Sequence, residues 1–194
     1  MLGNHNVQLK IYKDLNMDYM FKGVKDLISV EMKSENKCQI LSMISTFEDC
    51  INLNTFNITG FVADNLKSMK KLFYKSSLNN YHFSQFNTTN LKDISYMFAS
   101  SPISHFSFND FNLNQVTDMS HLFEECYSLT LINFTNVDTS NVKDMSYMFN
   151  SCSAIKDIDL SYLKTSQVIN MSNMFKDCIS LTNLKTNNFD TSNV

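Results

Sequence analysis

Arginine and tryptophan are absent from this 194-residue chain, and proline and glycine are scarce, with one Pro and three Gly. Without Arg, no side chain can clamp a phosphate or carboxylate through two parallel hydrogen bonds. The basic residues are all Lys, they are scattered, and the formal net charge is -3. Because nucleic-acid binding needs a basic stripe that neutralises phosphates, we expect no nucleic-acid partner. Lys without Arg, together with abundant Asn, is typical of an AT-rich genome.

Long apolar runs are missing as well. No stretch of about 18 apolar residues occurs, so we expect no transmembrane segment. The first six residues lack the charged and apolar regions of a signal peptide, so we expect no export signal in the chain as given. The scarcity of Gly and Pro also argues against sandwiches and barrels that depend on many tight turns.

Motifs of catalytic and cofactor sites are missing too. The sequence has no nucleophile elbow, phosphate-cradling glycine loop, dinucleotide fingerprint or His-Glu-x-x-His segment. Three glycines are too few for the first two kinds of motif. We therefore expect a protein that is not an enzyme and that binds no cofactor.

A repeat runs through most of the sequence and is its strongest signal. A Phe recurs every 25 or 26 residues, at Phe21, Phe47, Phe73, Phe98, Phe123, Phe149 and Phe175. An apolar residue precedes each of these by four positions, and from Phe47 onward a Cys or Ser follows by three. Between these markers lies a second pattern of four apolar residues, for example Leu129, Ile132, Phe134 and Val137.

Two periods alternate inside each repeat. Ile132 and Phe134 alternate with polar residues, which predicts a short strand with one buried face. Thr139-Ser140 supply N-cap oxygens for a short helix that follows. The spacing of one helical face is present in Val142, Met145, Met148 and Phe149. One such unit cannot enclose its own apolar face, so the units must stack.

Two neighbouring repeats are one residue shorter than the others. The missing residue lies just before Leu78 in one and just before Ile103 in the other. The same two repeats carry Ser76 and Ser101 where other repeats have Cys. A length change limited to one turn is what a stacked coil permits, because each turn faces solvent.

These patterns resemble a known family. The strand pattern resembles the leucine-rich-repeat template. Three sequence segments resemble motifs of the BspA-like leucine-rich-repeat surface proteins: Phe189-Asp190-Thr191-Ser192-Asn193-Val194, Met145-Ser146-Tyr147-Met148-Phe149 and Cys152-Ser153-Ala154-Ile155. The resemblance covers roughly residues 21–194. It implies extracellular or surface-anchored proteins of bacteria and some protists that act in adhesion or protein binding, without known catalysis.

One column departs from that template. Where the template has Asn or Cys, this chain has Phe61, Phe86, Phe111, Val137, Leu163 and Phe189. We therefore expect a buried apolar row in place of the template's Asn ladder.

The predicted fold is α/β: a leucine-rich-repeat solenoid, coiled right-handed, with a parallel β-sheet on one side and short helical segments on the other. Residues 1–20 are predicted as an N-terminal cap in which Val7, Leu9 and Ile11 alternate as an edge strand. Residues 21–194 are predicted as about six to seven leucine-rich-type coils with the last one truncated. Val194 is equivalent to Val142, so we expect self-association through an uncapped C-terminal end.

The cysteines share one column of the repeat, which contains Cys126, Cys152 and Cys178. Three thiols in a line leave one unpaired if two form a bridge. We expect small buried packing residues, with one disulfide or a metal as the alternative.

Histidines and carboxylates give no metal or catalytic pattern. His82 and His105 fall on the outer side of neighbouring strands, but no thiol or carboxylate accompanies them, so we predict no metal site. Asp157 and Asp159 are a carboxylate pair on one strand. Because nothing apolar surrounds them, a solvated acidic face is favoured over acid-base chemistry.

The side chains between the buried strand positions are the candidate binding residues, because stacked strands create an extended surface. They are Thr55, Asn57, His82, His105, Ser107, Asn133, Asp157, Asp159, Asn183 and Lys185. The set is mostly polar and short of aromatic residues, so we expect weak, avidity-dependent binding. We predict a non-enzymatic module that binds a protein or a glycan. One interpretation is adhesion at the cell surface or in secreted form, as the resemblance implies. The alternative is an intracellular protein-protein interaction scaffold in the cytoplasm, which the missing export signal favours.

Overall fold

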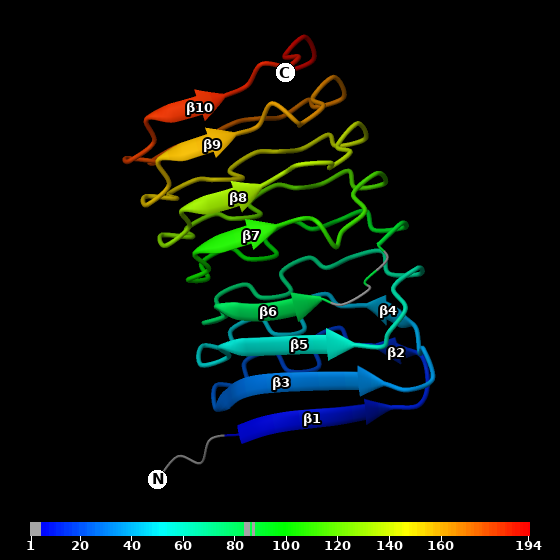
Figure 1. The fold of residues 1–194 in the computed structure, drawn as a ribbon. Coiled ribbons are helices and arrows are strands. Elements are labelled where there is room, and N and C mark those ends of the chain that lie inside the picture. The colour runs from blue at the N-terminus through cyan, green and yellow to red at the C-terminus, as the bar shows by residue number, and fades with distance from the viewer. Residues whose placement is uncertain (1–4, 84–85, 87) are drawn as a thin grey trace.

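The chain folds into a β-solenoid of about 7 coils, each close to 26 residues long (Figure 1). The computed structural model describes residues 5–83, 86 and 88–194, so the first four residues of the predicted cap lie outside it. Short strands of successive coils stack into a wall that runs from the N-terminal to the C-terminal end. The strands are β1 (His5–Ile11), β2 (Leu15–Asn16), β3 (Leu27–Ser34), β4 (Ile40–Ser42), β5 (Thr55–Thr59), β6 (Asn80–Phe83), β7 (His105–Ser107), β8 (Leu131–Asn133), β9 (Asp157–Asp159) and β10 (Asn183–Lys185).

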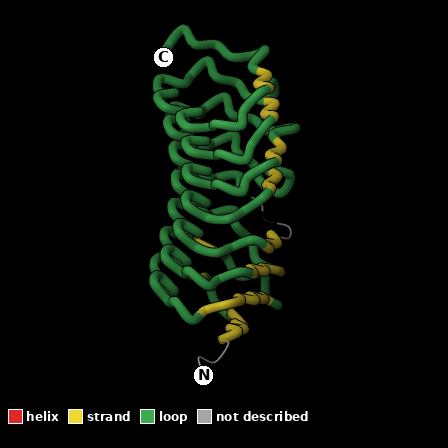
Figure 2. The backbone as a smooth tube through the Cα atoms, turned by 90° about the vertical axis from the view of Figure 1, so that its left-hand side faces the viewer, coloured by secondary structure: helices red, strands yellow, loops and turns green. Residues whose placement is uncertain are grey.

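The strands of neighbouring coils pair in parallel, as predicted. One sheet has the order β1-β3-β5-β6, while β7 pairs with β8 and β9 pairs with β10. A second parallel ladder lies in the segment before the repeated Phe, formed by β2 and β4 and continued by bridges such as Asp118 to Asp144. Seen from the side, the strands of the wall gather along one edge of the stack and turns form the other (Figure 2).

A single apolar core runs along the inside of the stack. The repeated Phe residues form a continuous column from Phe21 to Phe175, with neighbouring ring centroids 5.4–5.9 Å apart and ring planes within 17° of parallel. Each such pair contributes about 0.5–1.5 kcal/mol beyond the area it buries. The apolar row that was expected in place of an Asn ladder is also present, since Phe61, Phe86 and Leu163 are buried.

The short helical segments predicted for the other side do not form. No helix occurs in the described part of the chain, and none there could therefore cross a membrane. The predicted helical segment is instead a run of tight turns with two residues in the left-handed backbone region, Tyr147 at φ 56° and Ser151 at φ 61°. The positions two residues before and after the repeated Phe have positive φ in every coil, from Tyr19 to Asp177. A left-handed residue cannot continue a right-handed helix.

Backbone hydrogen bonds between coils take the place of helical ones. In this turn segment every second amide donates to the next coil: Tyr147 N to Ser172 O and Phe149 N to Met174 O, both at 2.9 Å. The intervening amides donate within their own coil, as Asn150 N does to Tyr147 O at 3.0 Å. The turns therefore satisfy their backbone groups by stacking, which ties each coil to its neighbour along this side.

The sequence predicted that Thr139 caps a helix, but in the structure it does not. Its buried hydroxyl donates to Lys164 O at 3.0 Å and accepts from Lys164 N at 2.8 Å, and both groups lie in the next coil. Thr165 makes the same pair of hydrogen bonds to Asp190. The Thr of the recurring Thr-Ser pair is thus a bridge between coils.

The cysteine column consists of packing residues, as expected, and the alternative disulfide is not formed. All five cysteines are free. The buried thiols donate to the Phe carbonyl of the preceding coil, Cys126 Sγ to Phe98 O at 3.2 Å and Cys152 Sγ to Phe123 O at 3.1 Å. Burial raises the pKa of the Cys126 thiol to about 12, so the thiol is protonated at neutral pH.

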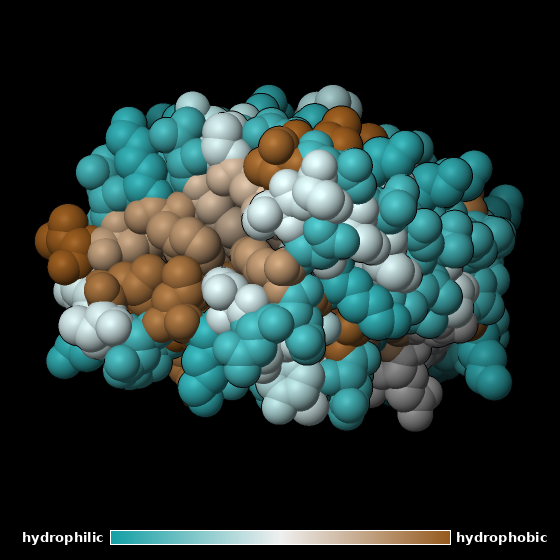
Figure 3. Space-filling view, turned by 90° about the horizontal axis from the view of Figure 1, so that it is seen from above, coloured by the Kyte–Doolittle hydropathy of each residue, from teal (hydrophilic) through white to brown (hydrophobic). Residues whose placement is uncertain are grey.

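The apolar residues of the last coil are more exposed than their equivalents in other coils. Leu184 on β10 is 42% exposed, whereas its partner Ile158 on β9 is 2% exposed. Seen along the stack from the C-terminal end, apolar side chains form a patch with a hydrophilic rim (Figure 3).

Candidate binding site on the strand face

The outward side chains of the stacked strands form two parallel rows, which we call the strand face. On β9, Asp157 and Asp159 point outward on either side of the buried Ile158. The strand registers align equivalent positions, for example Asp157 with Asn183. The first row contains Ser29, Thr55, Asn80, His105, Leu131, Asp157 and Asn183, and the second contains Glu31, Asn57, His82, Ser107, Asn133, Asp159 and Lys185.

All ten residues predicted from the sequence lie in these two rows, and their side chains are exposed or half-buried. The prediction missed other members of the same rows, above all Leu131, which is 63% exposed. Sequence reasoning takes an apolar residue in a strand repeat as buried. The available signal was its position, because Leu131 directly precedes Ile132, and alternation points the two side chains to opposite faces.

The two histidines of the strand face are not brought together as a site. His105 lies in the first row and His82 in the second, and β6 and β7 do not pair in the described residues. His105 instead contacts Ser104 and Tyr81. Its Nδ1 lies 3.2 Å from Ser104 Oγ, and its ring centroid lies 6.3 Å from that of Tyr81. Within the described ranges, no group of three His, Cys, Asp or Glu side chains could hold a metal ion.

The carboxylates of β9 are engaged by neighbouring polar groups. Lys185 Nζ lies 3.3 Å from Asp159 Oδ2, and the Asn183 amide donates to Asp157. Hydrogen bonds from the Ser161 hydroxyl and amide, assisted by Lys185, hold the pKa of Asp159 below its ordinary value. A general acid needs a raised pKa, so this carboxyl is arranged to remain charged.

A shallow depression of about 570 Å³ lies over the C-terminal strands. It is lined by Leu131, Ile132, Asp157, Ile158, Asp159, Thr182, Asn183, Leu184 and Lys185. Four of the predicted residues line it, and Leu131 and Leu184, which are 63% and 42% exposed, give it an apolar part. Its chemistry suits a partner that presents an apolar group next to hydrogen-bonding groups.

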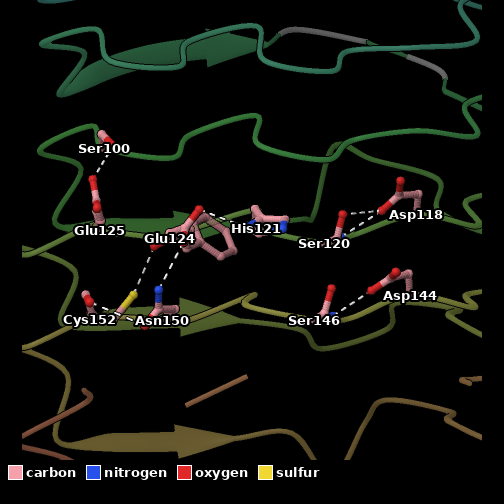
Figure 4. A network of polar contacts seen from close by, with 12 residues as sticks. Ser100, Asp118, Ser120, His121, Glu124, Glu125, Asp144, Ser146, Asn150 and Cys152 are labelled. Carbon is pink, nitrogen blue, oxygen red and sulfur yellow. Dashed lines mark hydrogen bonds and ion pairs between the residues drawn. The ribbon is translucent and has the colours of Figure 1, made fainter. Parts of the chain in front are cut away.

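A second polar cluster lies in the turn segment, away from the strand face (Figure 4). The His121 ring stacks between Tyr96 and Tyr147, with centroid distances of 4.1 and 4.7 Å. Glu124 accepts hydrogen bonds from Asn150 Nδ2 at 3.0 Å and lies 2.8 Å from His121 Nδ1. These side chains are half-buried and connect successive coils, so the cluster stabilises the stack.

Comparison with known proteins places the chain in a family. Comparison with curated proteins and with solved structures gave no match. One family matches twice, over residues 8–108 and over residues 103–194, and the two matches together span nearly the whole sequence. The chain therefore belongs to the family described as Mycoplasma protein of unknown function, DUF285.

Proposed function

We propose that this chain is a non-enzymatic binding module whose strand face engages a macromolecular partner, a protein or a glycan, in adhesion at the cell surface. The observation that carries the proposal is the alignment of polar side chains in two rows along the stacked strands. Stacked strands present such rows at a fixed spacing of about 4.8 Å. A surface of this kind suits an extended partner that makes many similar contacts.

At the C-terminal strands, the surface suits a protein partner better than a glycan. Leu131 and Leu184 are apolar and exposed beside polar residues, which suits contact with an apolar part of a partner. Asp157 and Asp159 place negative charge beside them, partly offset by Lys185. The partner group that fits is an apolar patch bordered by basic side chains.

The resemblance to BspA-like surface proteins supports the role in adhesion. The shared repeat length and motifs carry that resemblance, and it implies adhesion or protein binding. The lowered pKa of Asp159 supports a non-enzymatic role for this carboxyl, because a general acid needs a raised pKa. With few aromatic residues in the rows, each contact is weak, so the module works by avidity over several copies.

The proposal is tested by binding of a multimerised chain to arrays of purified extracellular-matrix proteins and glycans. Leu131→Ser should weaken binding to the protein that is found by up to about tenfold. Ile169→Ser is the matched control, since Ile169 is also 63% exposed but lies in the other ladder segment. Equal effects of the two variants, or binding that survives Leu131→Ser, would contradict the assignment of the strand face.

We also propose that the apolar patch of the last coil mediates self-association of the 194-residue chain. Leu184 and Val194 are exposed there, and Phe189 is only partly buried. Light scattering tests this directly: Leu184→Lys should shift the chain toward a monomer, and a monomer before the change would refute the proposal.

A further inference from the structure

A recess lies at the corner where the turns enter the strands, and it is separate from the strand face. In coils of full length, two residues separate the core Cys from the next core Leu, as Tyr127-Ser128 do between Cys126 and Leu129. The two shortened coils have one residue there, Ser77 or Pro102. Because these two coils are neighbours, their short turns leave a gap two coils wide in an otherwise even edge.

The structure contains a recess of about 290 Å³ at this place. Its two side walls are the longer turns on either side, which carry Ile51 (48% exposed) and Tyr127 (58% exposed). The walls belong to coils three steps apart, so they are separated by roughly 14 Å at the spacing of stacked strands. The floor consists of the shortened turns, with Ser76, Ser77, Ser101 and Pro102.

The lining combines an aromatic wall with polar groups of both hydrogen-bonding kinds. Glu125 accepts a hydrogen bond from Ser100 Oγ through Oε2 at 2.7 Å, and its other oxygen has no hydrogen-bond partner in the described structure. Lys75 lies on the same rim with its ammonium group 5.0 Å from the Tyr74 ring centroid, and Ser128 supplies a hydroxyl. One Lys and one Glu balance each other, so the lining carries no excess charge to select an ionic ligand.

We propose that this recess binds a neutral disaccharide unit of a glycan. A pyranose ring has an apolar C–H face that packs on an aromatic ring, and Tyr127 is the exposed aromatic side chain in the lining. Its hydroxyl groups both donate and accept, which matches the free oxygen of Glu125 and the ammonium group of Lys75. The coil spacing of roughly 14 Å between the two walls exceeds one pyranose ring and accommodates two in a row.

Other ligand classes fit this lining less well. A phosphate or an acidic sugar would meet Glu125 and would find no Arg in the whole chain. An apolar peptide side chain needs an enclosed apolar pocket, whereas this recess is open to solvent and has three serines beside Pro102 in its floor. None of the ten predicted strand-face residues lines the recess, so it can bind a ligand even if the proposed function of the strand face fails.

The experiment is an NMR titration of the full chain with maltose, cellobiose, lactose and N,N′-diacetylchitobiose, and in parallel with a Leu-rich peptide. We expect one of the disaccharides to shift the amide signals of residues 75–77, 100–101 and 125–128 at millimolar concentration. Tyr127→Ala should weaken this binding about tenfold. Tyr12→Ala is the matched control, because Tyr12 is also highly exposed (69%) and lies in the first coil, outside the recess.

A second pair of variants tests the recess without removing its aromatic wall. Inserting one residue after Ser77 and one after Pro102 restores turns of full length, and it should abolish the shifts while the thermal melt remains cooperative. Glu125→Gln keeps an acceptor oxygen and should reduce binding only modestly. The proposal is overturned if no disaccharide shifts these signals, if the peptide alone does so, or if Tyr127→Ala and the insertions leave binding unchanged.

Discussion

Replacing the hydroxyl of Thr139 tests how one coil is fastened to the next. In Thr139→Val the side chain keeps its shape but loses the donor to Lys164 O and the acceptor for Lys164 N. Thr139 is fully buried. Each hydrogen bond contributes about 1 kcal/mol net, and leaving its partner unpaired in a buried place adds to the loss. We therefore expect the free energy of unfolding to fall by about 2–4 kcal/mol.

The assay is thermal unfolding followed by circular dichroism, supported by urea unfolding. A loss of about 3 kcal/mol lowers the Tm of a domain of this size by roughly 6–12 °C. Thr139→Ser keeps the hydroxyl and should recover most of the difference, apart from the cost of one buried methyl group. This rescue separates the hydrogen bonds from the packing of the side chain.

The repeat itself supplies a matched control. Thr191 occupies the same position in the last coil, but its side chain is exposed and its hydroxyl has no hydrogen bond in the described structure. Thr191→Val should therefore change stability by less than about 0.5 kcal/mol. If Thr139 acted as a local cap within its own coil, the two substitutions would have similar effects. Equal Tm shifts would refute the inter-coil bridge.

Three further predictions concern the core, the turns and pH. Met145→Asp places an unpaired charge in a fully buried position and should lower the free energy of unfolding by more than about 4 kcal/mol. Lys143→Asp, at an exposed position, should be nearly neutral. Similar thermal melts for the two variants would show that Met145 is not buried. Ser151→Gly should stabilise the chain by about 0.5 kcal/mol because Ser151 has a φ of 61°, and a lower urea midpoint would contradict this. Burial raises the pKa of Cys50 to about 11 and of Cys126 to about 12, so both thiols stay protonated in the folded state while those of the unfolded chain ionise near pH 9. The stability that these thiols contribute should then be lost as the pH rises from about 9 toward 12. Urea unfolding over this pH range should show a smaller loss of stability in the variant that combines Cys50→Ser and Cys126→Ser.

The repeat and the inside of the solenoid could be predicted from the sequence, because burial leaves a direct trace in residue type. The column of Phe residues and the parallel strands follow from apolar spacing, and the free cysteines follow from the position of three thiols in one column of the repeat. Met145 and Phe149 are fully buried, as their spacing indicates. In a stacked coil every turn must present the same interior, so seven weak signals at one register add up to a strong one.

The path of the backbone on the turn side could not be predicted in the same way. Apolar spacing of i, i+3, i+6 and i+7 reports which side chains are buried, but a helix and a run of tight turns can bury the same residues. Glycine would have marked the left-handed positions, yet only Gly23 does so there. The others hold ordinary residues such as Lys71 and His121. Inter-coil hydrogen bonds such as that of Tyr147 to Ser172 hold these residues in the left-handed conformation. Those bonds form only when the coils stack, and the local propensities of residues carry no information about stacking.

The candidate sites depend on places where the repeat is interrupted, and this limits what periodicity can show. An interior column must recur in every coil, so it cannot distinguish one partner from another. Leu131 interrupts a polar row, and the short turns at Ser77 and Pro102 interrupt an even edge. Tyr127, at the wall of the recess, lies four residues before Leu131, so a single coil supplies an exposed apolar side chain to each surface. The sequence showed the shortened turns plainly, but only the stacking of coils converts two missing residues into a recess with walls.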